Sequence, residues 1–294
     1  MVLKIRKNET GNIIGVILFL IPALVLFVAF FIYPVIHIAI TSFTQWDGMS
    51  DPIFNGINNY IKIFKDKVFI RSIVNNVIWA LVAGFLQVPL AMFTALMLAQ
   101  KPKGWKIMRT VYFLPQVISG VALATMWSAV YNAQYGLLNG LLELIGLGKY
   151  SKNWLGTVQT AFPAILIYWV FYVGYYMVIM LADIQTVPED YYEAAAIDGA
   201  SKLRMSFSIT VPLIKNSIFT CMTLAMVFGL RQFEQVYMLT DGGPANRTSV
   251  MVLYLYKEMQ KYSYGTSSAA AMILIIVGSA VIIGLRILEK ATDK

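Results

Sequence analysis

The chain has 294 residues, of which 59% are apolar and only 13% are charged, and its mean hydropathy is +0.68. Because soluble domains carry roughly 25% charged residues, this composition excludes an ordinary soluble protein and indicates an integral membrane protein. The formal net charge of +8 does not indicate a nucleic-acid-binding protein, because the basic residues lie at the ends of apolar runs and form no dense stripe.

Six apolar stretches are predicted to be transmembrane helices. A helix needs about 20 apolar residues to cross the hydrocarbon core of a bilayer. Five uncharged runs are long enough, and a sixth, interrupted by Arg231 and Glu234, is included because the distribution of basic residues requires it. The chain is therefore expected to be all-α, a polytopic membrane protein with a single transmembrane domain over residues 1–294. Its expected spans are 13–40, 73–99, 110–131, 157–182, 214–239 and 266–286.

The first apolar run is predicted to be a retained helix. It is too long for the core of a signal peptide and has no small-residue cleavage pattern. Proline lacks a backbone N–H and clashes with the preceding turn, so Pro22 and Pro34 are expected to kink this helix.

The basic residues near the span ends predict the orientation, because such residues mark the cytoplasmic side. With six spans, 13 lysines and arginines fall on one side of the membrane. Both termini and the long polar loop at residues 186–213 are therefore expected in the cytoplasm. The 13 residues are Lys4, Arg6, Lys7, Lys101, Lys103, Lys106, Arg109, Lys202, Arg204, Lys215, Arg286, Lys290 and Lys294.

The polar loop at 186–213 is predicted to fold as two short helices joined by a turn. Asp190 is expected to cap the first helix, and Gly199 suits the left-handed position that ends it. The second is expected from Ser201 to Phe207. An amphipathic helix lying on the membrane is the alternative. It would need bulky apolar residues where this segment has small alanines.

No catalytic residue, metal site or phosphate-binding loop is predicted. The only Gly-Lys pair, Gly148-Lys149, is followed by Tyr150 rather than Ser or Thr, and Glu143 stands where a phosphate loop needs its first glycine. The HExxH, CxxC and GxSxG patterns do not occur, and Cys221 and His37 are the only residues of their types. Any ATP used by this protein would therefore be bound by a separate subunit.

Two elements of the sequence resemble the ABC importer permeases. The polar loop, with Glu193-Ala194-Ala195 followed by Asp198-Gly199-Ala200, resembles their EAA loop. The stretch Thr240 to Pro244, which contains Gly-Gly-Pro, resembles the carbohydrate branch that includes the first permease subunit of the maltose and glycerol-3-phosphate systems. The resemblance covers essentially the whole chain. It implies a type I ABC importer permease fold with a cytoplasmic EAA coupling helix.

The same resemblance implies the partners and the mechanism. Such a permease pairs with a second homologous permease subunit, two ATPase subunits that bind ATP and Mg, and an extracellular or periplasmic sugar-binding protein. It lies in the plasma (inner) membrane among lipids, binds no cofactor or nucleic acid itself, and imports a sugar or oligosaccharide by alternating access. The residues expected to contact the ATPase are Glu193, Ala194, Ala195, Asp198, Gly199 and Ala200.

Two helical faces are candidates for the sugar site. Tyr168, Tyr172 and Tyr175 follow each other at spacings of four and three, which places them on one face of a helix. In the related maltose permease the matching positions of the fourth and fifth spans line the sugar site, although several carry different residues there. A packing role for the aromatic stripe is the alternative. The expected substrate-binding residues are Tyr168, Phe171, Tyr172, Tyr175, Ala225, Phe228, Gly229 and Gln232.

Other interpretations remain open at the level of sequence. Arg231 and Glu234 are spaced as neighbours on one helix and could partly neutralise each other. The solute could be a polyol or a glycerophosphodiester rather than a sugar. A secondary transporter is the alternative from another class, and it should carry ion-site carboxylates near mid-membrane. Glu234 is the only acid within the predicted spans.

Overall fold

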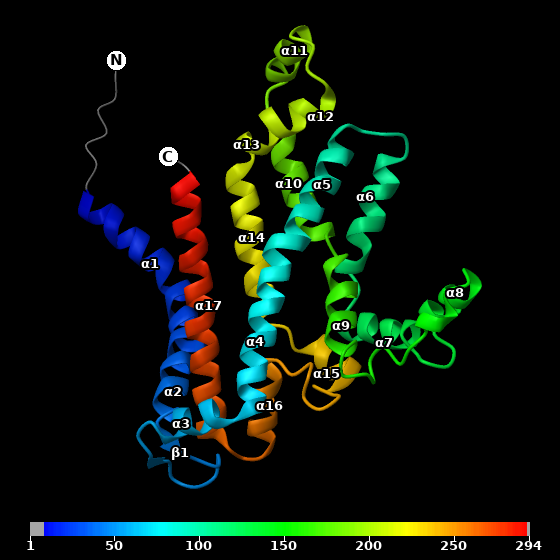
Figure 1. The fold of residues 1–294 in the computed structure, drawn as a ribbon. Coiled ribbons are helices and arrows are strands. Elements are labelled where there is room, and N and C mark those ends of the chain that lie inside the picture. Colours follow the sequence, from blue (N-terminus) through cyan, green and yellow to red (C-terminus); the bar gives the residue numbers. More distant parts are fainter. Residues whose placement is uncertain (1–8, 293–294) are drawn as a thin grey trace.

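The computed structural model describes residues 9–292, with the side chains of residues 15–292. Figure 1 shows a mostly helical chain whose long helices run side by side between two ends, with one small hairpin, β1 (Thr44–Gln45) paired with β2 (Ile53–Phe54). The helical elements are α1 (Glu9–Phe27), η1 (Val28–Ile32), α2 (Tyr33–Thr41), α3 (Asn58–Lys65), α4 (Lys67–Val82), η2 (Ala83–Gln87), α5 (Val88–Ala99), α6 (Trp105–Phe113), η3 (Leu114–Gln116), α7 (Gly120–Val130), α8 (Leu137–Leu144), η4 (Gly148–Tyr150), α9 (Ala161–Val170), α10 (Gly174–Ile184), α11 (Asp190–Ile197), α12 (Lys202–Met205), η5 (Ser206–Thr210), α13 (Val211–Leu213), α14 (Lys215–Leu230), α15 (Glu234–Thr240), α16 (Met251–Gln260) and α17 (Tyr264–Thr292).

Four helical stretches are long and apolar enough to cross a membrane. Two further pairs of helices meet the same criteria but are bent, by 100° between Gln116 and Gly120 and by 73° between Leu213 and Lys215. The chain is thus a multi-pass membrane protein with four to six candidate spans, and it reaches six only if each bent pair forms one span. The four long stretches are Gly15–Thr41, Lys67–Ala99, Ala161–Ile184 and Tyr264–Thr292.

The third expected span, 110–131, is wrong as a single helix. Helix α6 ends in the 3₁₀ turn η3, and α7 starts anew after the bend. Pro115 opens the 3₁₀ turn, and the hydroxyl of Ser119 accepts a hydrogen bond from the backbone N–H of Ala122, at 3.2 Å. Ser119 is therefore a new N-cap in the middle of an apolar run, and such a cap fixes the start of a separate helix.

Each of three prolines inside a long helix follows a π-turn. The wider turns η1, η2 and η5 end two residues before Pro34, Pro89 and Pro212, respectively. A proline cannot donate to the carbonyl four residues earlier, and its ring collides with that carbonyl. A locally widened turn relieves the collision while the helix continues. The expected distortion near Pro34 is thus accommodated within one helical stretch.

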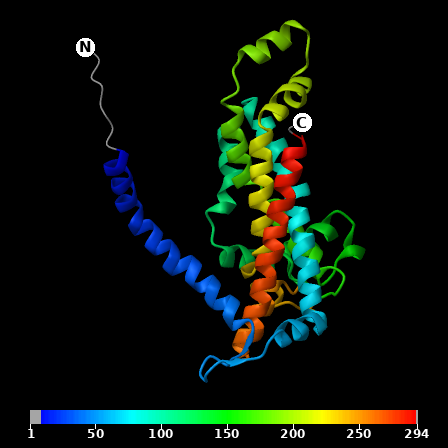
Figure 2. The same ribbon diagram turned by 90° about the vertical axis from the view of Figure 1, so that its left-hand side faces the viewer.

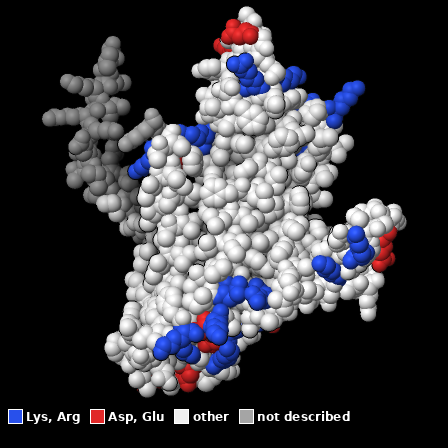
Figure 3. Space-filling model, in the orientation of Figure 1, with Lys and Arg blue, Asp and Glu red and all other residues white. Residues whose placement is uncertain are grey.

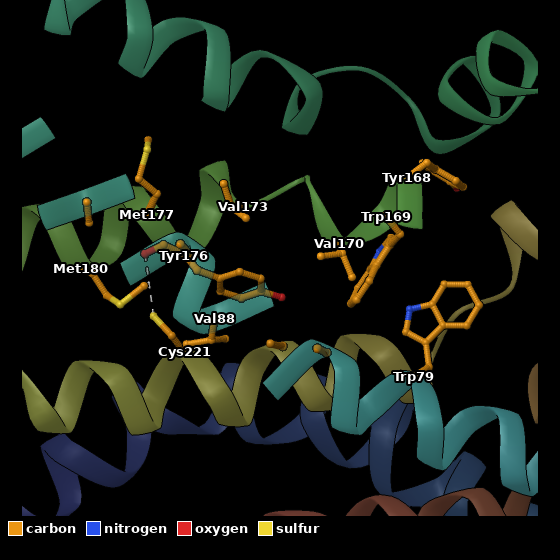
Figure 4. Packing of buried hydrophobic residues seen from close by; sticks show 14 of the residues in the cluster. Trp79, Val88, Tyr168, Trp169, Val170, Val173, Tyr176, Met177, Met180 and Cys221 are labelled. Atoms are coloured by element: carbon orange, nitrogen blue, oxygen red, sulfur yellow. Dashed lines mark hydrogen bonds between the residues drawn. The ribbon is translucent and has the colours of Figure 1, made fainter. Parts of the chain in front are cut away.

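The core of the chain lies between α4, α5, α10 and α14. Figure 4 shows the buried aromatic and sulfur-containing side chains of this region interleaved between the helices. The rings of Trp79 and Trp169 meet edge to face with their centroids 5.6 Å apart. Cys221 is buried here against α10. Close packing of this kind replaces the hydrophobic effect as the main force between helices in a bilayer.

Gly174 allows one of the closest contacts between helices. A Cβ atom at this position would lie 2.1 Å from the carbonyl oxygen of Tyr112 on α6. We expect Gly174→Ala to destabilise the protein by about 1 to 3 kcal/mol, because a backbone oxygen cannot move aside as a flexible side chain can. Thermal unfolding in detergent measures this loss. Gly140→Ala is the control, because a Cβ at Gly140 would meet nothing within 4 Å; equal melting temperatures for the two variants would contradict the expectation.

The first helix differs from the others in its surroundings. Figure 2 shows that α1 diverges from the bundle, and every residue from Gly15 to Tyr33 is exposed. Only the following helix α2 packs against α17. An apolar helix with so little contact within its own chain must be covered by lipid or by another protein.

Different structural elements lie at the two ends of the molecule. Helices α11 and α12, the α5–α6 connection and the end of α17 gather at one end, and the hairpin, α3 and α16 lie at the other (Figure 1). Figure 3 shows charged side chains at both ends and a broad uncharged belt between them. The basic residues Lys4, Arg6, Lys7 and Lys294, on which part of the predicted orientation depends, lie outside the described residues.

The hairpin end is ordered by polar contacts. The backbone N–H groups of Ser50 and Met49 donate to a carboxylate oxygen of Asp47 at 2.8 and 2.9 Å, respectively. These hydrogen bonds favour the charged form and lower the pKa of Asp47 to about 2.

Candidate functional site

A cavity of about 400 Å³ opens where three helical stretches are interrupted. The interruptions lie between η3 and α7, between α9 and α10, and between α14 and α15. Ile118, Tyr172 and Gln232, one from each interruption, line the cavity. Irregular backbone at membrane depth is tolerated only where protein buries it or where it lines a cavity. The three breaks therefore mark this cavity as the candidate binding site.

Glutamine side chains compensate for the break between α9 and α10. The side-chain amide of Gln87 donates to the carbonyl oxygens of Trp169 and Tyr172, at 3.0 and 3.2 Å. Gln116 donates to the Tyr172 carbonyl as well, at 3.1 Å. The Trp169 carbonyl also accepts a hydrogen bond from the backbone N–H of Tyr172, at 3.1 Å, so the amides supplement the shortened backbone bonding at the break. Two intramembrane glutamines thus hold one wall of the cavity.

We expect Gln87→Leu to destabilise the protein by about 1 to 3 kcal/mol. The substitution leaves buried carbonyl groups with fewer donors at membrane depth. Thermal unfolding in detergent measures the loss. The control is Gln134→Leu, because the Gln134 side chain is exposed in a loop. Equal stability of the two variants would show that Gln87 does not hold the break.

Asparagines join other segments in a similar way. The amide of Asn76 donates to the carbonyl of Leu230, the last residue of α14, at 2.8 Å. The amide of Asn75 donates to the carbonyls of Arg247 and Ser249, at 2.9 and 2.7 Å, and so fixes the turn that contains Gly-Gly-Pro against α4. Both asparagines are buried. They therefore connect segments of the chain rather than line the cavity.

Four of the eight predicted substrate-binding residues line the cavity: Tyr172, Tyr175, Phe228 and Gln232. The rings of Tyr175 and Phe228 meet edge to face, with their centroids 6.3 Å apart across α10 and α14. The indole N–H of Trp127 donates to the hydroxyl of Tyr172. The structure thus brings part of the predicted set together on one wall, although a role in binding stays a prediction.

The other four do not line the cavity in this conformation. The expected face of three tyrosines is wrong because the helix is broken at residues 171–173, so residues before and after the break do not keep helical spacing. Tyr168 is only 1% exposed and stacks on Trp127, while Phe171 is 66% exposed outside the cavity. Ala225 is buried, and Gly229 packs against Trp79 and Ala80 of α4.

The expected pairing of Arg231 with Glu234 is also wrong. Helix α14 ends at Leu230 and α15 begins at Glu234, so the two residues do not share a helix. Neither forms an ion pair with any other residue that the structure describes. Glu234 lines the cavity instead.

The predicted substrate-binding set did not include several residues of the cavity, although Gln87 and Gln116 are recognisable in the sequence as intramembrane polar residues that could either join helices or line a channel. The available signal was the presence of amide and acidic side chains inside apolar runs, since such groups are costly in a bilayer unless they serve a structure or a pathway. The missed lining residues include Gln87, Gln116, Trp169, Tyr176, Glu234 and Gln235.

A second candidate site is the helix α11 at the far end of the molecule. Figure 1 shows α11 as its outermost element, and Figure 3 shows acidic side chains at this tip with basic ones just below. Gly199 has a φ of +77° and so occupies the expected left-handed position after the helix. Asp190 does not cap the helix as expected, because it is already its first residue and Glu189 stands at the cap position.

The two short helices of this loop are joined by a side-chain contact. The hydroxyls of Tyr192 on α11 and Thr210 on η5 are 2.9 Å apart. Ser201 begins the second helix by accepting a hydrogen bond from the backbone N–H of Arg204, at 3.3 Å. This contact connects α11 to η5, which continues through α13 into α14 on the border of the cavity.

The surface of α11 is open to a partner. Glu193 and Ala194 are exposed, as are Asp198 and Gly199, whereas Ala195 and Ala200 are half-buried. The side chain of Ile197, which sequence reasoning did not select, is 87% exposed at the end of the helix. Tyr191 on the same helix and Leu203 on α12 are also exposed, by 54% and 65%, so the loop presents several apolar side chains among its charged ones.

The described residues contain no group of three His, Cys, Asp or Glu side chains that could hold a metal ion. The lining of the cavity consists of aromatic, amide and apolar side chains with one carboxyl group, that of Glu234.

Comparison with known proteins agrees with this architecture. The chain is 36% identical to the probable ABC transporter permease protein YurN of Bacillus subtilis (strain 168), over 88% of this chain and 90% of the relative. It is 32% identical to the trehalose/maltose transport system permease protein MalF of Thermococcus litoralis (strain ATCC 51850 / DSM 5473 / JCM 8560 / NS-C), over 97% and 95% of the two chains, respectively.

The fold is similar to that of a solved transporter chain. A bacterial alginate ABC transporter, in complex with an alginate pentasaccharide-bound periplasmic protein, matches with a TM-score of 0.84 and 22% identity, over 97% of each chain. The model of the family described as binding-protein-dependent transport system inner membrane component matches residues 87–294, more than half of the chain. This protein therefore belongs to the family of inner-membrane permease components of binding-protein-dependent transport systems.

Proposed function

We propose that this chain is the permease subunit of an ATP-driven importer that moves a sugar or oligosaccharide across the plasma membrane by alternating access. The observation that carries the proposal is the cavity, whose aromatic and amide side chains meet at three helix breaks. Relatives named for trehalose and maltose and for multiple sugars support the same substrate class.

The chemistry of the cavity suits a sugar. Sugars offer hydroxyl groups to hydrogen-bonding side chains and apolar ring faces to aromatic side chains. Tyr175 and Phe228 supply aromatic surface, and Gln232 supplies an amide.

The coupling role is assigned to α11. Its exposed Glu193 and Ile197 would dock on an ATPase subunit, and the contact between Tyr192 and Thr210 would pass the motion toward α14. Nucleotide would then shift the equilibrium between two conformations of the cavity, because it binds one arrangement of the ATPase subunits better than the other. ATP and Mg belong to those subunits in this scheme.

The assembly follows from the same assignment. In the proposed complex a second homologous permease completes the cavity, two ATPase subunits bind on the side of α11, and a sugar-binding protein docks at the hairpin end. The α11 end, with the α5–α6 connection, would face the cytoplasm, as would both termini. The exposed apolar surface of α1 is available to the second permease or to lipid.

The ATPase activity of the purified complex tests this proposal. If the chain is a sugar permease coupled through α11, a sugar-loaded binding protein should stimulate ATP hydrolysis by the complete importer several-fold. The sugar-free binding protein should stimulate it less. Absence of stimulation with every sugar of a broad oligosaccharide panel would contradict the proposal.

A further inference from the structure

A second cavity, of about 620 Å³, lies beside the polar loop and is separate from the candidate sugar site. One wall comes from the end of α5 and the connection to α6, and another from the end of α10. The polar loop closes it with residues of α11, α12 and η5, including Tyr192 and Lys202. Neither the resemblance nor the assignment of α11 gives this cavity an occupant.

The lining of this cavity divides into an apolar part and a cationic part. Leu96, Ile184 and Val187, at the ends of two apolar helical stretches, supply the apolar surface. Lys101 and Lys202 supply two positive charges, and neither forms an ion pair with another described residue. An occupant with an apolar body and an anionic head would match both parts.

The charged side chains that line the cavity are positive overall. Glu189 is the only acidic residue in the lining. Trp105 also lines the cavity, with the Nζ atom of Lys106 5.9 Å and the guanidinium carbon of Arg109 5.7 Å from its ring centroid. Lys106 and Arg109 lie beside this tryptophan, whereas Asp190 and Glu193 lie beside the lining residues of α11. The net positive charge is therefore that of the lining itself, with two lysines and one carboxylate.

The position of the cavity fits the boundary of a bilayer. It lies where the stretches Lys67–Ala99 and Ala161–Ile184 end, and both are long and apolar enough to span. Tryptophan is enriched at the membrane interface. Basic pockets between transmembrane helices at this depth suit the phosphate groups of anionic lipids, whose acyl chains remain in the hydrocarbon.

We propose that this cavity binds the headgroup of an anionic phospholipid, with Lys101 and Lys202 contacting the phosphate and the apolar wall contacting the upper acyl chains. The lipid would bridge the α5–α6 connection and the polar loop, since Lys101 belongs to the first and Lys202 to the second. Its binding does not depend on which solute is transported.

Lipid retention on the purified complex tests this proposal. The complete transporter is exchanged into an equimolar mixture of phosphatidylglycerol and phosphatidylcholine, and bound lipids are counted by native mass spectrometry. The wild type should retain phosphatidylglycerol in excess. The double variant Lys101→Gln, Lys202→Gln should reduce the preference for phosphatidylglycerol by about thirtyfold, because each lysine near an anionic lipid contributes about 1 kcal/mol and 1.4 kcal/mol is a factor of ten.

A matched charge change provides the control. Lys149→Gln, Lys152→Gln removes the same charge from the α8–α9 connection, which does not contribute to this cavity, and should retain wild-type binding. Equal retention of the two lipids by the wild type would overturn the proposal, as would an undiminished excess in the first variant or an equal loss in the control. Displacement of the lipid by millimolar inorganic phosphate would also overturn it, because the site would then belong to a free anion.

Discussion

Replacing Gly199 with valine is expected to reduce sugar uptake by at least about tenfold while ATP hydrolysis continues. Gly199 has a φ of +77°, a conformation that costs a β-branched residue about 1 to 3 kcal/mol. The strain would be relieved by refolding the end of α11, which displaces Ile197 and Glu193 from the surface assigned to the ATPase subunit. Uptake and ATP hydrolysis by the same reconstituted complex measure the uncoupling.

Gly199→Asn is the matched control for this experiment, because asparagine tolerates the left-handed conformation much better than valine. A Cβ at this position meets no atom within 4 Å, so neither variant creates a clash. The asparagine variant should keep most of its uptake. Full coupled transport by the valine variant, in an assembled complex, would exclude α11 as the coupling helix.

Alanine substitutions at Tyr175 and Gln232 are expected to weaken sugar-dependent uptake by about tenfold to a hundredfold each. Both side chains line the cavity, Tyr175 from α10 and Gln232 from the gap between α14 and α15. Loss of a hydrogen bond or of an aromatic contact in a site shielded from water costs about 1 to 3 kcal/mol, and 1.4 kcal/mol corresponds to a factor of ten. The concentration dependence of uptake measures the loss.

Phe171→Ala is the control for the cavity variants. Phe171 lies in the break next to Tyr172, but its side chain is 66% exposed and does not line the cavity. Its removal should leave the affinity for sugar close to that of the wild type. If Tyr175→Ala and Gln232→Ala also had the affinity of the wild type, these residues would serve packing and the cavity would not be the binding site.

The sequence predicts the long apolar helices well, because length and hydropathy are local properties. The stretches Lys67–Ala99 and Tyr264–Thr292 contain the expected spans 73–99 and 266–286. The turn after α11 was equally predictable, since Gly199 follows a short run of helix-forming alanines. These features need no knowledge of distant contacts.

The breaks that build the cavity could not be predicted from hydropathy. The run from Tyr168 to Tyr176 is apolar and aromatic apart from Gly174, and the break within it is held by Gln87, about eighty residues away, which donates to two carbonyls there. The local hydropathy pattern does not reveal a hydrogen-bond donor that lies so far away in the sequence. Arg231 and Glu234 do interrupt the apolar pattern of the sequence. The interruption coincides with the gap between α14 and α15 and not with a pairing on one helix.

Uptake by the complete importer in proteoliposomes tests the central claim most directly. We predict that at least one sugar of an oligosaccharide panel accumulates inside, and that accumulation requires both ATP on the ATPase side and the binding protein on the opposite side. Uptake without ATP, driven by a sodium or proton gradient, would contradict the assignment. So would ATP-dependent uptake of other solutes with no uptake of any sugar.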